Sequence, residues 1–151
     1  MDNTANHTAR QIAEWFLAWG EHNDAPLSNL KLQKLLYYAQ GHYLGDHAKP
    51  LFEDEIEARV HGPVVRSIYH FLKSSGRGPI DVDEVVGDDF NWDSFRDVEE
   101  DLMRVWNTYG KYEAWALRER THREDPWKST FDHEARYRVI PKETMQKFFA
   151  R

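Results

Sequence analysis

The amino-acid sequence predicts a mainly α protein, a compact helical bundle with one small β element. Two segments, 8–20 and 28–45, repeat apolar residues at helical spacing behind good N-cap residues. Residues 50–62 and 80–86 depart from helical periodicity, so the β element is expected in one of them. The chain has 151 residues, the size of one domain. We therefore expect a single domain over 1–151, with 1–7 as a flexible N-terminus.

The first two helices have clear start signals. Thr8 and Gln11 can form a capping box, and Ser28 is a good N-cap for the second helix. Gly20 is expected to close the first helix as a left-handed cap, and Gly45 to stop the second. The apolar positions of the first helix are Ile12, Trp15, Phe16 and Trp19. Those of the second are Leu30, Leu32, Leu35, Leu36, Tyr37, Tyr38, Ala39 and Tyr43, a width that places this helix centrally in the bundle.

The middle of the chain changes character. Ile56, Ala58 and Val60 alternate with polar residues, which predicts a short strand. Gly62 permits unusual backbone angles, and Pro63 suits the first position of a helix over 63–73. That helix would bury Val64, Ile68, Phe71 and Leu72. The following stretch, 74–90, predicts a mobile surface loop with a short strand at 80–82.

Three further helices are expected. Asp93 can cap one whose apolar positions are Phe95, Val98, Leu102, Val105 and Tyr109, with Gly110 at its end. A short helix over 112–120 should turn Tyr112, Trp115, Ala116 and Leu117 inward. The last begins near Pro141, with Met145, Phe148 and Phe149 on its apolar side.

The segment T-H-R-E-D-P-W at 121–127 raises the question of chemistry. Asp125 before Pro126 is a helix-start signal, and Thr121 with Glu124 satisfies a capping box, so two starts remain open. Trp127 would anchor the new turn in the core. A catalytic interpretation needs His122 as a base or metal ligand, but one histidine beside acids in sequence is weak evidence. The structural interpretation is favoured.

The motifs of several site classes are missing. The chain has no cysteine, which excludes disulfides and thiolate metal sites. It contains no H-E-x-x-H, no phosphate-binding glycine motif and no G-x-S-x-G. We therefore expect no catalytic residues, no metal and no cofactor.

Charge and hydropathy bear on partners and location. The formal net charge is −6, with basic residues mixed among acids, so autonomous nucleic-acid binding is not expected. A basic protein partner would be electrostatically easier to bind. No signal peptide and no membrane-spanning run is visible, which predicts a soluble cytoplasmic protein.

Lys34 stands within the apolar face of the second helix. Its stem could pack while the ammonium reaches water. A sharper hypothesis is a salt link from Lys34 to a partly buried acid such as Glu57.

Five segments together resemble the Panacea domain, also called the SocA-like or phage-associated GepA-like family. They are K-L-Q-K-L-L-Y-Y-A-Q at 31–40, E-I-E-A followed by H-G-P-V-V at 61–65, the Tyr109–Gly110 break, T-H-R-E-D-P-W at 121–127, and I-P-K-E-T-M-Q-K-F-F at 140–149. The resemblance covers roughly residues 10–149. The motif positions to which it gives a structural role are Lys34, Leu35, Tyr38, Glu57, Gly62, Pro63, Val64, Thr121, His122, Pro126 and Trp127.

The resemblance implies a helical antitoxin that neutralises a protein toxin encoded beside it, not an enzyme. Family members are often carried by phages, and SocA-like members also deliver their toxin to the ClpXP protease. The present chain has Lys111-Tyr112-Glu113 after the Tyr-Gly break, where relatives often have a small polar cap, so Tyr112 would add aromatic surface. His122 and Trp127 should then pack near the central helix and Lys34.

The interaction surface is expected in the loop 74–90 and at four aromatic residues, Trp19, Tyr37, Trp92 and Tyr112. Two alternatives stay open. One is a proteolytic adaptor that delivers a partner to ClpXP without being an antitoxin, or another phage-encoded interaction protein. The other is a hydrolase or nuclease that uses His61, His122 and nearby carboxylates.

Overall fold

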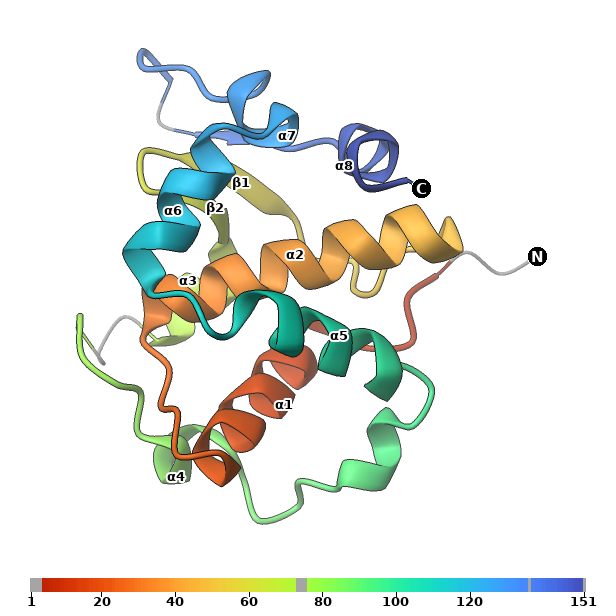
Figure 1. Ribbon diagram of the computed structural model, residues 1–151, viewed down its shortest axis with the longest axis vertical. Helices are drawn as coiled ribbons and strands as arrows, with labels where there is room; N and C mark the ends of the chain where they lie inside the picture. Colours follow the sequence, from red (N-terminus) through yellow and green to blue (C-terminus); the bar gives the residue numbers. More distant parts are fainter. Residues whose placement is uncertain (1–3, 73–75, 136, 151) are drawn as a thin grey trace.

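A central helix organises the molecule. The computed structural model describes residues 4–72, 76–135 and 137–150, and α2 (Asn29–His47) runs through its middle (Figure 1). Helices α1 (Ala9–His22), α4 (Val82–Val85) and α5 (Glu99–Tyr109) lie on one side of it. A small sheet, α6 (Ala114–His122), α7 (Asp125–Lys128) and α8 (Lys142–Phe149) lie on the other. The predicted fold class, mainly α with a small β element, is confirmed.

Burial on all sides explains why α2 is central. Leu32, Leu35 and Leu36 are fully buried, and so are Tyr37 and Tyr38 on another face of the same helix. The predicted cap at its start is confirmed, because the Ser28 hydroxyl accepts a hydrogen bond from the backbone N–H of Lys31 at 3.3 Å. A helix that is apolar around most of its circumference must be covered by other elements.

The capping box of α1 is confirmed, since the Thr8 side chain accepts from Gln11 and the Gln11 side chain accepts from the Thr8 backbone. The two glycine stop signals are wrong. Helix α1 continues past Gly20 to His22, and α2 continues past Gly45 to His47 before Ala48 adopts the left-handed conformation with φ 55°. These glycines serve close packing instead of chain reversal.

The sheet has the order β2–β1–β3 and both of its pairings are antiparallel. Strands β1 (Ile56–Arg59) and β2 (Gly62–Val65) form a hairpin, and β3 (Arg138–Val139) pairs with β1 from far along the chain. The β element expected near 50–62 is therefore confirmed. The alternative near 80–86 is wrong, because Asp81 caps the short helix α4 there.

The expected helix over 63–73 begins later than predicted. Pro63 lies in β2, opposite Ala58, and α3 (Arg66–Leu72) starts only after the strand. A proline is tolerated in an edge strand, where its missing N–H faces away from the neighbouring strand. Phe71 is exposed, contrary to expectation, whereas Val64, Ile68 and Leu72 are buried. Residue 73 lies outside the described part of the chain.

The helices expected after residue 90 form close to their predicted positions, but some of the side chains expected to be buried are exposed. All five apolar positions predicted from Phe95 to Tyr109 are buried. However, Asn91, not Asp93, caps the 3-10 helix η2 (Trp92–Phe95) that precedes α5. In α6 only Leu117 and Thr121 are buried. The residues wrongly expected to face inward are Tyr112, Trp115 and Ala116 in the α6 region and Phe148 in α8, all of which are exposed.

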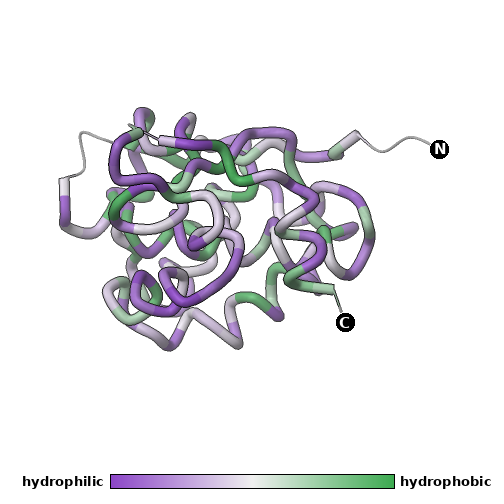
Figure 2. The backbone as a smooth tube through the Cα atoms, turned by 90° about the horizontal axis from the view of Figure 1, so that it is seen from above, coloured by the Kyte–Doolittle hydropathy of each residue, from purple (hydrophilic) through white to green (hydrophobic). Residues whose placement is uncertain are grey.

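The ends of the described chain lie on the same side of the molecule (Figures 1 and 2). Of the N-terminal segment expected to be flexible, residues 1–3 lie outside the description, while Ala5 donates to the Glu53 carboxylate at 2.8 Å and His7 bonds Asp97 at 3.0 Å. Hydrophobic and hydrophilic residues alternate along the tube in Figure 2. Among the described residues no helix is long and apolar enough to cross a membrane.

Helix α8 rests on two glycines of α2. A Cβ at Gly41 would collide with the ring of Phe149, and one at Gly45 would lie 2.5 Å from the Phe149 carbonyl oxygen and 2.9 Å from the Ala150 nitrogen. Contacts at these distances leave no space for a methyl group. The stripe formed by Gly41 and Gly45 therefore lets the backbone of the C-terminal segment approach α2 closely.

We predict that Gly45→Ala destabilises the protein although alanine is the better helix former. Helix propensity alone would raise the free energy of unfolding by about 1 kcal/mol, whereas the clash with backbone atoms should cost about 1–3 kcal/mol. Urea unfolding followed by far-UV circular dichroism measures the sign. Gly78→Ala is the control, because no atom lies within 4 Å of its added Cβ. A Gly45→Ala protein more stable than the wild type would show that α8 is not seated on this glycine.

Candidate functional site

The turn between β1 and β2 collects most of the sequence motifs. We call Arg59–Pro63, together with the side chains that hold this segment, the turn site. Gly62 has φ +105°, and a Cβ there would lie 2.8 Å from Cε of Lys34 and 2.9 Å from Oγ1 of Thr121. Both the backbone angle and the lack of space require glycine. The H-G-P motif is therefore a hairpin turn pressed onto α2 and α6.

The side chain of Lys34 reaches this turn from α2. Its side chain is fully buried, and Nζ donates a hydrogen bond to the carbonyl oxygen of Pro63 at 3.0 Å. Burial, with the nearby Arg118 guanidinium, lowers the pKa of Lys34 to about 7. The expectation that this ammonium reaches water is wrong. The lysine instead completes the hydrogen bonding of a buried backbone carbonyl.

The predicted salt link from Lys34 to Glu57 is also wrong. Side chains alternate along a strand, so Glu57 points away from the face that carries Ile56 and Ala58 in the core. Its carboxylate pairs with Arg59 at 2.6 Å and with Arg66 at 3.9 Å. Glu57 is thus a buried acid beneath two arginines on the outer face of the sheet.

Three residues of T-H-R-E-D-P-W contact the turn from α6 and α7. Trp127 donates from Nε1 to the carbonyl oxygen of Arg59 at 2.7 Å. The His122 ring stacks on Trp127 with a centroid distance of 4.0 Å and an interplanar angle of 8°, and it hydrogen-bonds the backbone of Val60. Both side chains are half-buried. The Thr121 side chain is buried against Gly62.

The predicted helix start at Asp125–Pro126 is confirmed, but neither Asp125 nor Thr121 caps that helix. Helix α6 continues through Thr121, whose hydroxyl donates to the Arg118 carbonyl oxygen within the helix. Asp125 and Pro126 are the first two residues of α7, and Glu124 is the N-cap without a side-chain cap hydrogen bond. The Glu124 carboxylate is engaged elsewhere, which explains why it does not close a capping box.

Two tyrosines of α2 donate to that carboxylate. Tyr37 bonds one oxygen of Glu124 and Tyr38 the other, each at 3.1 Å. Burial raises the pKa of Glu124, while both hydrogen bonds oppose the rise. Burial and the nearby Glu124 charge raise the pKa of both tyrosines. The arrangement fixes α7 on α2 through a partly buried acid whose two oxygens are both hydrogen-bonded.

The histidines near the turn are not arranged as a catalytic pair. Arg118 donates from Nε to Nδ1 of His61 at 3.2 Å, so this nitrogen acts as an acceptor. Burial and then the Arg118 charge lower the pKa of both His61 and His122, which favours neutral rings. Within the described residues no carboxylate hydrogen-bonds either ring, and no cluster of three histidine or acidic residues could hold a metal ion.

Two buried amides of α2 were missed by the sequence reasoning. The Gln33 amide accepts from the Val65 N–H at 2.7 Å and donates to the Val65 carbonyl at 3.4 Å. Gln40 accepts from the Leu51 N–H and donates to the Phe52 carbonyl, both at 2.8 Å. The available signal was the presence of polar residues on a helix that is otherwise apolar on all faces.

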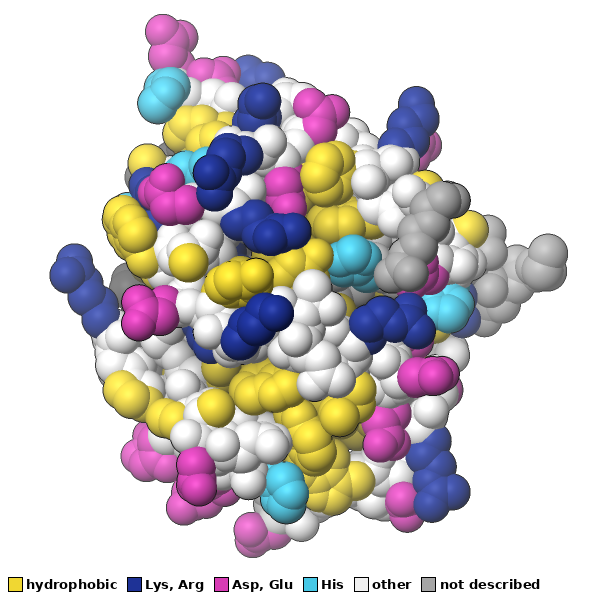
Figure 3. Space-filling model, in the orientation of Figure 1, with side chains coloured by type: hydrophobic (Ala, Val, Ile, Leu, Met, Phe, Trp, Pro, Cys, Tyr) yellow, Lys and Arg dark blue, Asp and Glu magenta, His cyan; other side chains and the backbone are white. Residues whose placement is uncertain are grey.

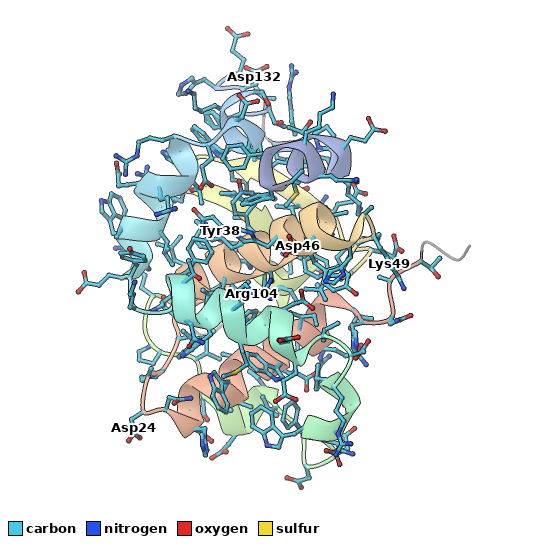
Figure 4. The ribbon with its side chains drawn as sticks, turned by 45° about the vertical axis from the view of Figure 1, so that its right-hand side comes forward. Asp24, Tyr38, Asp46, Lys49, Arg104 and Asp132 are labelled. Atoms are coloured by element: carbon cyan, nitrogen blue, oxygen red, sulfur yellow. The ribbon has the colours of Figure 1, made fainter. Side chains whose placement is uncertain are left out.

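Helix α5 packs against the side of α2 that faces away from the hairpin (Figure 1). Tyr38 stacks on Tyr109 with a centroid distance of 3.8 Å, and Arg104 reaches Asp46 at 3.3 Å in the region that Figure 4 labels. A small pocket of about 120 Å³ lies between the two helices. These contacts are structural, because they join neighbouring helices of the core.

The four aromatic residues expected at a partner surface differ in how far they are buried. Tyr37 is fully buried, so its expected exposure is wrong: as part of α2 it is covered by α8 and α7. Trp19 is half-buried and touches Trp92, which is 43% exposed, with ring centroids 5.9 Å apart. Tyr112 is 38% exposed and lies before α6.

A family model described as antitoxin SocA-like, Panacea domain, matches residues 32–128. The chain belongs to this family. The match begins within α2 and ends with α7, so it includes Lys34, the hairpin turn and T-H-R-E-D-P-W, the residues that meet in the turn site. Of the expected resemblance over 10–149, the Panacea match omits α1, β3 and α8.

A curated relative agrees with the family. Antitoxin SocA from Caulobacter vibrioides (strain NA1000 / CB15N) is 41% identical over 68 residues, which cover 45% of this chain and 36% of that protein. The aligned segment of this Panacea protein thus spans about a third of the length of its relative. No solved structure matches the chain.

The buried lysine of the Panacea domain predicts a pH dependence of stability. Between the native pKa of about 7 and the ordinary value of 10.5, the unfolded chain holds a proton on Lys34 that the native state lacks. The free energy of unfolding should therefore rise with pH across this window, and this contribution is absent below it, where both states are protonated.

We expect the rise from pH 7 to pH 9 to be about 2 kcal/mol larger in the wild type than in Lys34→Met, which keeps the stem and removes the ammonium. Urea unfolding at both pH values gives this double difference, in which the titration of groups that do not interact with Lys34 cancels. Lys147→Met, at an exposed lysine of α8, is the matched control. An equal pH response in Lys34→Met and wild type would contradict the buried, mostly neutral lysine.

Proposed function

We propose that this protein is an antitoxin that binds and neutralises a cognate protein toxin encoded by a neighbouring gene. The observation that carries the proposal is the match to the antitoxin SocA-like family over the part of the chain that forms the turn site. The similarity to antitoxin SocA supports the same role. Because that match covers little more than a third of the relative, the role is a proposal for this chain.

The geometry of the turn site supports a binding protein and not an enzyme. Its polar side chains are directed at backbone atoms of the hairpin: Lys34 at Pro63, and Trp127 at Arg59. Groups engaged in this way build the fold and do not present a reactive atom to a substrate. The function then depends on surface that the turn site positions.

Neutralisation would proceed by covering the active surface of the toxin. Exposed aromatic side chains are the residues that supply most binding energy at protein interfaces, and two of the aromatic residues expected at the partner surface, Trp92 and Tyr112, are exposed. Delivery to a protease such as ClpXP is the alternative mechanism. The two differ in the fate of the toxin, which stays intact in a stable complex under the first and disappears under the second.

The test is growth of cells that express the neighbouring reading frame with and without this protein. We expect growth arrest by the neighbour alone, restored growth with both, and copurification of the two chains. The toxin should remain at an unchanged level on immunoblots of the rescued cells, because occlusion does not consume it.

A gene for this protein with an early stop codon is the control, since it keeps the RNA and removes the chain. A neighbour that is harmless alone, or toxic in both conditions, would contradict the proposal. Rescue accompanied by loss of the neighbour from the immunoblot would replace occlusion with proteolytic delivery.

A further inference from the structure

Negative charge is concentrated in one segment. Residues 81–101 contain ten Asp and Glu and a single basic residue, Arg96, a formal charge of −9; the whole chain carries −6, so all other residues together carry +3. The expectation that basic residues are mixed among the acids along the chain is therefore wrong for this segment. A net charge counted segment by segment would have found it.

The acids of this segment, which we call the acidic segment (81–101), are on the surface. All are exposed except Asp101, which is half-buried. Within the described residues only Asp93, Asp97 and Asp101 have a basic group within 4 Å, and for two of them it is a histidine. The remaining carboxylates are not neutralised by the protein itself.

The negative charge of the acidic segment affects the pKa values of neighbouring groups. Asp89 contributes, after burial, to a raised pKa of Glu14 in α1. Asp101 and Asp97 contribute, again after burial, to a raised pKa of Tyr43 in α2. The negative potential thus extends over the adjacent helices.

The acidic segment is held in place by the core. Ile80, Val82, Phe95 and Val98 are buried, and the Ile80 N–H donates to the Leu27 carbonyl at 2.9 Å. Turns and the short helices α4 and η2 connect these anchors. The carboxylates therefore lie on a backbone that is held in place by the core. Less conformational entropy is then lost when a partner binds.

An aromatic patch joins this segment to α1. It consists of Trp19 and His22 of α1 with Phe90 and Trp92 of the acidic segment. Trp92 meets Trp19 edge-on at 5.9 Å and Phe90 at 4.8 Å, while Trp19 stacks on His22 at 5.3 Å. Figure 3 shows hydrophobic side chains in the lower half of this face and acidic side chains along its lower edge.

Two exposed aromatic side chains outside the patch, Trp115 and Tyr112, lie against the chain's own cations. The Arg118 guanidinium lies 4.3 Å from the Trp115 ring centroid, and Lys111 lies 5.5 Å from that of Tyr112. In the described part of the chain no Lys or Arg lies over the rings of Trp19, Phe90 or Trp92. Trp19 itself stacks on both Trp15 and His22, so the exposed Trp92 is the ring of the patch that is open to a cation from outside.

We propose that the aromatic patch, with the carboxylates of the acidic segment around it, is the surface that binds the toxin, and that the toxin presents a basic face to it. The inference rests on the proposed function and adds where the partner binds and what chemistry it offers. Trp92 is the anchor, because it is the exposed tryptophan of the patch and contacts two of its other rings. Arg and Lys of the partner would meet the carboxylates at the rim and the ring faces at the centre.

The two parts of the surface should act on different steps of binding. Rim carboxylates accelerate encounter with a basic partner, and this effect weakens as salt screens the charges. A central tryptophan that is desolvated on binding mainly slows dissociation. Salt dependence and rate constants therefore separate the roles of acids and rings.

The experiment measures binding of the neighbouring-frame product to the full-length protein by surface plasmon resonance at two salt concentrations. We expect Trp92→Ala to raise Kd by about 30-fold or more, mostly through faster dissociation. The double variant Asp88→Asn with Asp89→Asn should slow association by about tenfold at low salt and much less at high salt. Both replaced side chains are exposed, so the substitutions leave the core unchanged, and thermal melting followed by circular dichroism checks the fold of both variants.

Trp115→Ala is the matched control, since it removes a more exposed tryptophan outside the patch. It should bind and rescue growth like the wild type. Loss of binding in Trp115→Ala with full binding by both patch variants would overturn the proposed surface and leave the antitoxin function standing. A wild-type chain that itself fails to bind would overturn the antitoxin function, and the inference with it.

Discussion

The fold depends on buried polar side chains of α2 that complete the hydrogen bonding of the segment 51–65. Gln40 pairs with the backbone of Leu51 and Phe52, Lys34 with the carbonyl of Pro63, and Gln33 with both backbone groups of Val65. An unpaired backbone group in a dry interior costs about 1–3 kcal/mol. Because each pair joins a helix to an irregular or edge segment, these side chains determine where the hairpin lies, and the hairpin determines where α6 and α7 can dock.

This dependence explains which features could be predicted from the sequence. The caps at Thr8 and Ser28, the central position of α2 and the buried positions of α5 follow from residues within one or two turns of each other. The family resemblance was likewise carried by local motifs. The roles of Lys34 and Glu124 could not be obtained in this way, since their partners lie 29 residues away at Pro63 and 86 or more away at Tyr38 and Tyr37.

The errors share a physical cause. Glycines were interpreted as chain breaks, but Gly20 and Gly45 stay helical because another backbone segment packs against them at 2.7 Å and 2.5 Å from an added Cβ. Pro63 was interpreted as a helix start because its φ fits one, yet pairing with β1 keeps the chain extended through Val65. At Gly45 and Pro63 tertiary contact overrides a local preference of about 1 kcal/mol, which is the expected outcome when packing and propensity compete.

The residues that build the fold and the residues proposed to bind the partner are different ones. Lys34, Gln33 and Thr121 are buried and cannot reach another protein. Apart from Asp101, the carboxylates of the acidic segment are exposed and largely without basic partners, so their replacement would change the surface potential without disturbing the core. Surface substitutions away from buried contacts usually alter stability by only about 0.5 kcal/mol. A domain built in this way can change its partner through its surface while keeping the buried hydrogen bonds that define its shape.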